Sequence, residues 1–176
     1  RMTSILKVTE IQDPTNSNKA LEIDNSGHVE ISNRIEWPDR PAFTVGYNST
    51  TGSYVTLVTS GGLSDTIPFN TVTQARNANA SSGWDNSTHI YTVPIAGPYL
   101  ISVWGLRSSA ADWEISIAKN QNFSGNARFY VNNSRGVSGT VLLNLAVNDE
   151  IQAYAGAAVY LDADSVYSGM SFVYMG

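Results

Sequence analysis

Apolar and polar residues alternate along much of this chain with the two-residue period of β-strands. The clearest stretch is 84–104, where polar turn formers lead into a short β-rich segment, a corner at 94–97 and a second segment at 99–104. Proline and glycine at such a corner are typical of a turn between two strands. We therefore predict two strands that meet there.

The second of these strands, residues 99–104, is apolar on both sides. Successive side chains of a strand point to opposite faces, which gives two sets: Tyr99, Ile101 and Val103, and Leu100, Ser102 and Trp104. The last strand repeats this pattern, with Met170, Phe172 and Tyr174 on one side and Val173 and Met175 on the other. If one face fills the core of the domain, another copy of the subunit can cover the second.

The rest of the chain continues as short β-like segments. We predict further strands at 42–47, 55–59, 66–72, 113–118, 127–131, 137–145, 150–155, 159–161 and 170–174. The loop at 74–82 has no apolar stripe and so is not predicted to be a helix. Many short strands without a helix predict an all-β sandwich or jelly roll.

Residues 1–40 differ in texture from this pattern. Leu21 and Ile23, and then Val29 and Ile31, form alternating pairs on either side of a turn. Strands this short need partners in water. The partners could be neighbouring chains, in an N-terminal β stalk or anchor like the fibrous stalks of phage proteins, which the segment resembles, or the following domain. The prolines at 38 and 41 predict a linker, so the expected domains are 1–40 and 41–176.

Composition excludes several classes of protein. Charged residues make up 14% of the 176 residues, against about 25% in an average soluble protein, which is low for a solitary monomer. The net charge of -5, with no basic cluster, argues against nucleic-acid binding. Cysteine is absent, which excludes disulfide scaffolds and thiolate zinc sites. No apolar run is long enough for membrane insertion.

The start of the chain predicts its cellular origin. Residues 1–7 lack the charged-then-apolar order of a secretory signal, and Met2 follows Arg1. We expect Met2 to be the native start and the protein to be made in a cytoplasm.

Catalytic chemistry has little support. His28 and His89 are the only histidines, and no nucleophile elbow accompanies them. We predict no catalytic residue and no enzymatic activity, with His89 satisfied by a neighbour of its strand.

Two sets of residues remain as candidates for binding. Asp162 and Asp164 form a small acidic loop, which is either a weak calcium site or an exposed turn, because calcium takes six to eight oxygens. No other metal or cofactor is expected. Trp84, Tyr160 and Tyr167 are aromatics near predicted loops and are candidates for ligand or receptor contacts, the alternative being core or rim packing.

An ordered set of short motifs carries a family resemblance over about residues 41–176. The motifs are Pro41-Ala42-Phe43, Phe69-Asn70, Gly83-Trp84-Asp85, Tyr91-Thr92-Val93-Pro94, the run 97–103, Lys119-Asn120, 138–145, 148–151 and 168–175. Together they resemble the globular head of complement component 1q, which belongs to the tumour-necrosis-factor-like jelly rolls. Tyr91, Ile101, Val103 and Met170 depart from the aromatic residues that are usual in that family.

The resemblance implies an all-β jelly roll that assembles as a homotrimer. The trimer interface is then expected at Tyr99, Ile101, Val103, Phe172 and Tyr174. Calcium bound near the trimer apex of some relatives would place Asp162 and Asp164 near such a site.

The N-terminal segment and the head together predict a phage virion protein, a tail-fibre head that binds a host receptor. Its expected partners are other virion proteins, through the N-terminal segment, and a glycan or protein of the host surface. The alternatives are a capsid decoration protein and a secreted recognition module that binds glycans or proteins.

Overall fold

The computed structural model describes residues 10–12, 19–23, 29–30, 40–48, 54–58, 66–77, 79–156, 159–162 and 164–176. Within these ranges, side chains are not described at 10–12, 19–23, 29–30, 54–58, 123–126 and 159–160. The chain divides into two compact units, Arg1–Trp37 and Pro38–Gly176. We call the second unit the head.

The N-terminal unit contains a small antiparallel sheet. Its strands are β1 (Glu10–Gln12), β2 (Lys19–Ile23) and β3 (Val29–Glu30), in the order β1-β2-β3. The register pairs Ile11 with Leu21 and Ile23 with Val29. These are the alternating apolar positions of the sequence, and their use as a stalk stays a prediction.

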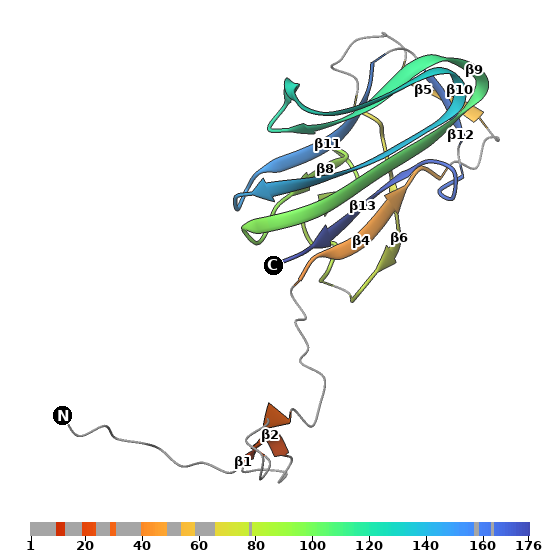
Figure 1. The fold of residues 1–176 in the computed structure, drawn as a ribbon. Helices are drawn as coiled ribbons and strands as arrows, with labels where there is room; N and C mark the ends of the chain where they lie inside the picture. The colour runs from red at the N-terminus through yellow and green to blue at the C-terminus, as the bar shows by residue number, and fades with distance from the viewer. Residues whose placement is uncertain are drawn as a thin grey trace. The chain divides into compact units, whose positions relative to one another are not determined.

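The head is built from antiparallel strands (Figure 1), and no helix of the described residues could cross a membrane. The strands are β4 (Ala42–Gly46), β5 (Tyr54–Val58), β6 (Thr71–Ala75), β7 (Trp84–Asp85), β8 (Ile90–Thr92), β9 (Gly97–Lys119), β10 (Asn122–Leu145), β11 (Glu150–Ala155), β12 (Val159–Asp162) and β13 (Gly169–Tyr174). The predicted all-β jelly-roll class is therefore confirmed.

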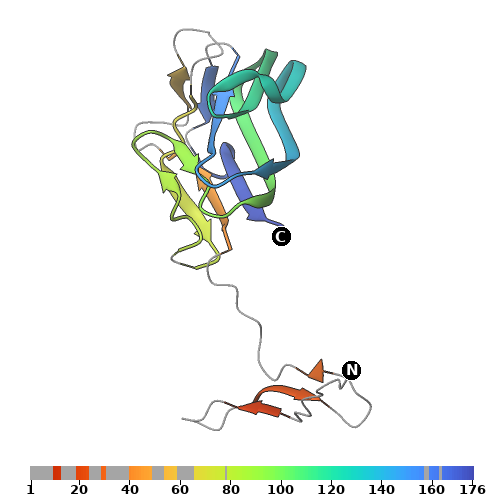
Figure 2. The same cartoon turned by 90° about the vertical axis from the view of Figure 1, so that its left-hand side faces the viewer.

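Strands β9 and β10 pass through both layers of the head (Figures 1 and 2). The first half of β9 lies between β13 and the second half of β10, and β13 in turn pairs with β4 and β4 with β6. The second half of β9 lies between the first half of β10 and β11, which continues to β8 and β7. The sequence predicts two separate strands for each, because the polar residues at the bend break the apolar alternation.

The sequence suggests that the corner at 94–97 joins two neighbouring strands, but in the structure it does not. Strand β8 pairs with β7 and β11, whereas the start of β9 pairs with β13 and β10. The corner therefore carries the chain from one layer to the other. Gly97 has φ 145, and its Cα lies against the ring of Tyr174, where a side chain would not fit.

The predicted strand at 66–72 is also wrong in its bounds. Thr66 makes only an isolated bridge with Tyr154, and β6 begins at Thr71. Pro68 has no N–H to donate to a ladder. The segment between instead places Ile67 and Phe69, both fully buried, in the core.

Aromatic rings fill the centre of the core. Phe172 stacks on Phe43 with ring centroids 4.8 Å apart and lies 4.5 Å from Tyr91. The Tyr99 hydroxyl donates to the carbonyl of Ile95 at 2.8 Å, so its buried polar end is satisfied. Strands of both layers contribute to this cluster, which holds the sandwich together.

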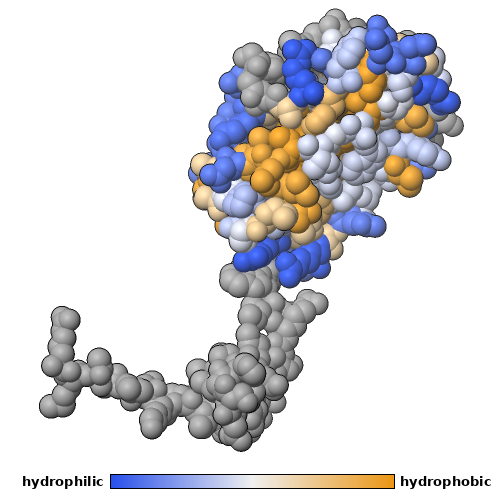
Figure 3. Space-filling model, viewed as in Figure 1, coloured by the Kyte–Doolittle hydropathy of each residue, from blue (hydrophilic) through white to orange (hydrophobic). Residues whose placement is uncertain are grey.

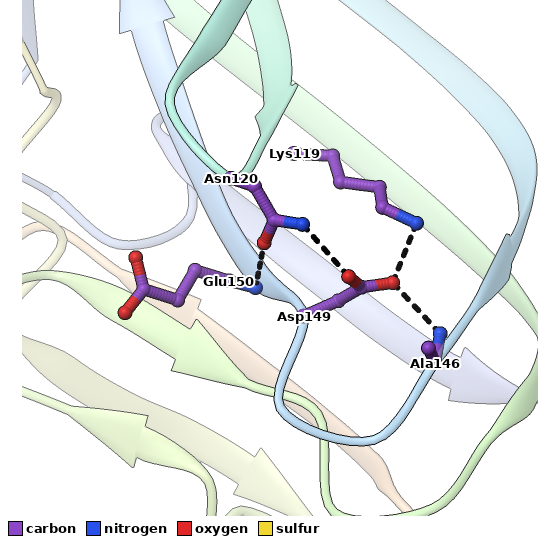
Figure 4. Close-up of polar contacts among 5 residues, drawn as sticks. All are labelled: Lys119, Asn120, Ala146, Asp149 and Glu150. Atoms are coloured by element: carbon purple, nitrogen blue, oxygen red, sulfur yellow. Dashed lines mark hydrogen bonds and ion pairs between the residues drawn. The ribbon is translucent and has the colours of Figure 1, made fainter.

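Asp149 ties together the loops at one end of the head (Figure 4). Its carboxylate accepts from the backbone N–H of Ala146 at 2.7 Å and the Asn120 amide at 2.8 Å, and pairs with Lys119 at 2.5 Å. Asn120 and Gln121 form the tight β9–β10 turn, with φ of 52 and 57. Burial of the carboxyl opposes its ionisation, but the Lys119 contact and the two hydrogen bonds outweigh it and lower the pKa of Asp149.

Candidate subunit interface

Most of the residues predicted to form a trimer interface lie inside a single subunit. Tyr99, Ile101 and Phe172 are 0% exposed, and Val103 is 1% exposed. Tyr174 is half-buried, and its hydroxyl donates to the carbonyl of Ala96 at 3.3 Å. Four of the five side chains fill the core of the head, so they are not accessible to another subunit. The trimer itself stays a prediction.

The opposite side of the same strands forms an outer face without a charged residue. Cross-strand register aligns twelve positions in three rows over β10, β9, β13 and β4. The rows are Leu142, Leu100, Val173 and Ala42; Thr140, Ser102, Ser171 and Thr44; and Ser138, Trp104, Gly169 and Gly46. We call these twelve positions the uncharged face.

The first row of the uncharged face is apolar and open to solvent. Leu142 is 60% exposed, Val173 39% and Leu100 36%. Figure 3 shows apolar side chains gathered on the visible side of the head, over this end of β9 and β10. Three neighbouring aliphatic side chains in water form a patch, and such patches mark interaction surfaces more often than single exposed residues do.

The second row consists of hydroxyl side chains. The Oγ of Ser102 and the Oγ1 of Thr140 lie 2.8 Å apart, so these two hydroxyls satisfy each other. Small, mutually paired hydroxyls can be covered by another surface at little desolvation cost. The middle of the face is therefore compatible with burial.

The third row is partly covered by the loop that precedes β13. The Trp104 indole lies against Gly169 and donates to the carbonyl of Val166 at 3.2 Å. Ser165 lies against Gly46 at the same end of the sheet. The exposed part of the uncharged face is thus its apolar and hydroxyl rows.

A shallow groove of about 340 Å³ continues this face toward β6. It is shared by four members of the uncharged face and by the end of β6; the lining residues are Ala42, Phe43, Thr44, Gln74, Ala75, Arg76, Ser171 and Val173. A neighbouring chain could place a protruding side chain in this groove.

The second half of strand β10 is the edge strand of this sheet and lies beside the apolar row. In the described part of the head this half pairs only with β9, and residues 138–145 include no charge and no proline. Free sheet edges in soluble proteins are usually protected by such residues. The apolar row and an unprotected edge therefore meet at Leu142.

The sequence offered a signal for which side of β9 faces outward. Leu100, Ser102 and Trp104 include a serine, and the equivalent positions of β13, β10 and β4 are Ser171, Thr140 and Thr44. The opposite set in β9, Tyr99, Ile101 and Val103, is aliphatic apart from one aromatic residue. A comparison of the two sets across strands would have assigned the inner and outer sides.

Two of the three predicted aromatic contacts can be described, and their surroundings differ. Trp84 is half-buried, lies 6.3 Å from the Phe172 ring and donates to Asn86 at 2.8 Å, so it belongs to the rim of the core. Tyr167 is 51% exposed on the loop before β13. The Tyr160 side chain lies outside the described residues.

Asp162 and Asp164 use their carboxylates within their own loop. Asp162 accepts from the N–H of Asp164 at 3.0 Å, and Asp164 accepts from the N–H of Val166 at 2.9 Å. No group of three or more acidic, histidine or cysteine side chains that could hold a metal occurs among the described residues. Their geometry is that of a hydrogen-bonded turn.

His89 lies in the turn before β8 and not within a strand, with φ 60. Its Nδ1 is 3.1 Å from the carbonyl oxygen of Phe69. His28 is outside the described residues.

Solved structures of known proteins share this architecture. The chain matches the globular domain of zebrafish complement 1qA with a TM-score of 0.54 and 16% identity, covering 78% of this chain and 98% of that one. The head has a complement-head and tumour-necrosis-factor-like jelly-roll fold. Murine APRIL matches with a TM-score of 0.58 and 12% identity, covering 76% of this chain and 98% of that one. Eiger TNF from S. frugiperda matches with a TM-score of 0.51 and 14% identity, covering 78% of this chain and 94% of that one.

Sequence comparison adds no relative to these structures. No protein-family model matches the chain, and no curated protein matches it either. At these identities, the likeness establishes the fold of the head and leaves its function to the surface features above.

Proposed function

We propose that this protein is a homotrimeric attachment module. The uncharged face of one head meets the β10 edge of the next, and the N-terminal unit connects the trimer to a larger particle. The observation that carries the proposal is the absence of charge over twelve aligned positions on the outer side of four strands, of which the apolar and hydroxyl rows are exposed. Lys, Glu and Asp are depleted in subunit interfaces relative to the remaining surface.

The shape of the two surfaces supports a ring more than a twofold dimer. A flat face and a strand edge are different surfaces, so a contact between them is heterologous. Heterologous contacts form a closed ring when the rotation between subunits closes. The family resemblance of the sequence implies that the ring has three members.

The most specific form of the proposal is a phage tail-fibre head that attaches to the host surface. Its support is the N-terminal unit, whose short strands resemble those of fibrous β stalks, and the low charge and absent cysteines of the chain. Three identical heads on one stalk would bind a repetitive surface with avidity beyond that of one head.

The assembly is tested by the mass of the protein in solution. Light scattering of the full chain is expected to give about three times the 19.0 kDa of one subunit. Leu142→Asp, which places a charge where the apolar row meets the free edge, is expected to give folded monomers. Tyr130→Ala is the matched control, since Tyr130 is equally exposed at 60% but lies on the other half of β10.

A wild-type monomer, or a Leu142→Asp protein that stays trimeric, would contradict the proposed contact. The biological setting is tested separately by antibody labelling of phage particles. Label at tail tips supports the fibre head, whereas label over the capsid supports a decoration protein. Particles without label would favour the secreted recognition module.

A further inference from the structure

Tyr130 is an exposed aromatic residue that the subunit contact does not use. It lies on the first half of β10, opposite Glu114 of β9, and is 60% exposed. Its neighbours in the strand, Phe129 and Val131, pack against the core, so Tyr130 lies on the outer side of its layer. This outer side belongs to the layer that does not carry the uncharged face.

A β-bulge places two polar side chains beside the tyrosine hydroxyl. The β9–β10 register shifts between Val131 and Ser134, and Asn133 in this bulge has φ 43. The backbone N–H of Asn133 donates to Asp112 Oδ1 at 2.8 Å. Bulges re-aim side chains, and they are over-represented next to functional sites.

The amide of Asn132 joins the carboxylate to the tyrosine. With its nitrogen turned toward Asp112, it donates to the two carboxylate oxygens at 2.9 and 3.1 Å and to the Tyr130 hydroxyl at 3.2 Å. Two planar hydrogen-bonding groups are thus fixed at the polar end of an exposed ring. A carboxylate has about four acceptor positions, and these contacts use three of them, so Asp112 retains one for a further donor.

The surroundings of Tyr130 are polar, unlike those of an apolar docking patch. Glu114 and Arg128 form an ion pair at 2.5 Å on the same side of the sheet. With Asp112, the local charge is negative, which disfavours anionic ligands. Partial desolvation of the hydroxyl and the nearby Asp112 raise the pKa of Tyr130. Its hydroxyl, like that of an ordinary tyrosine, is a proton donor at neutral pH.

We propose that Tyr130, Asp112 and Asn132 form a subsite for a neutral pyranose unit of a glycan. The apolar C–H face of the sugar ring packs on the tyrosine ring. One sugar hydroxyl donates to the Asp112 carboxylate and another bonds with the Asn132 amide. The subsite gives the proposed attachment module a class of ligand. Its geometry belongs to one subunit, so binding by a single head does not depend on trimer formation.

The test is saturation-transfer NMR on the full chain with an anionic comparison sugar, methyl sialoside, and four neutral probes: the methyl glycosides of galactose, mannose, glucose and N-acetylglucosamine. At least one is expected to receive saturation from the wild-type protein. Tyr130→Ala is expected to weaken that binding by about tenfold or more, whereas Tyr130→Phe, which keeps the ring, stays within about threefold of wild type. Asp112→Asn is expected to weaken binding by about fivefold, and it serves as the second variant if Tyr130→Ala does not fold.

Val147→Ala is the control. Val147 is 50% exposed but belongs to the loop between β10 and β11, and its truncation should leave sugar binding unchanged. The proposal is overturned if no probe binds, if Tyr130→Ala binds as wild type, or if methyl sialoside binds as tightly as the neutral sugars. Leu142→Asp should lose trimer formation and keep sugar binding, whereas Tyr130→Ala should keep trimer formation and lose sugar binding. Failure of one proposal is therefore distinguishable from failure of the other.

Discussion

Asp149 connects three segments at one end of the head. Its carboxylate holds the β9–β10 turn through Asn120, β9 through Lys119 and the β10–β11 loop through Ala146. Asp149 itself is 8% exposed, so these partners replace water at a nearly buried charge. The sequence motif indicates a turn at this position, but not the contacts with Lys119 and Asn120, which come from a distant part of the chain.

Asp149→Ala is expected to lower the free energy of unfolding by about 2 kcal/mol, because it leaves the amide of Asn120 and the N–H of Ala146 without their acceptor. Urea unfolding followed by fluorescence would measure the change. Asp164→Ala is the control: Asp164 is exposed and accepts one loop N–H, so its loss should be below about 1 kcal/mol. Equal losses in the two variants would contradict the role of Asp149.

The same carboxylate predicts a pH dependence of stability. Its pKa in the folded head is lowered, so its contribution is present above the unfolded value of about 3.9 and is lost as the pH falls through the folded value. Between pH 5 and pH 2, the wild type should lose more stability than Asp149→Asn, whose side chain does not titrate. Parallel losses, measured as urea midpoints, would mean that other carboxylates account for acid unfolding.

At the scale of the element, adjacent residues of β9 face opposite sides of the sheet, so substitutions at neighbouring positions can affect either folding or subunit association. Ile101→Asp puts a charge in the core, where the side chain is 0% exposed, and is expected to abolish the folded head. Leu100→Asp changes the adjacent residue, which is 36% exposed, and is expected to leave a folded subunit that no longer assembles. Circular dichroism and light scattering on the pair would separate the two effects. A folded Ile101→Asp protein would contradict the assignment of the inner side.

Strand existence could be predicted from the sequence, but pairing could not. The segments 42–47, 150–155 and 170–174 are close to β4, β11 and β13, because their alternation is regular. The sequence predicts two strands in place of β9 and two in place of β10. The residues near Asp112 and Asn132 are polar and show no apolar alternation, although the β9–β10 ladder continues through the bend that they form. The Tyr130 subsite depends on this bend and was not found for the same reason.

At the scale of the whole molecule, the division at Trp37 predicts two separable parts. Residues 38–176 hold the aromatic core, the uncharged face and the Tyr130 subsite, so this head alone is expected to fold cooperatively and to form trimers. Thermal unfolding and light scattering of the truncated chain would measure both properties. A truncated head that folds but stays monomeric would show that the N-terminal units supply the association.

The position of β13 has a consequence for synthesis on the ribosome. This strand, Gly169–Tyr174, lies between β4 and β9, and its Phe172 contacts rings from both layers. A nascent chain that has not reached residue 174 therefore leaves the middle of its sheet open, with Phe43 and Ile101 uncovered. The head is therefore expected to fold only after β13 has left the exit tunnel, and protease resistance of stalled chains should arise only at that length.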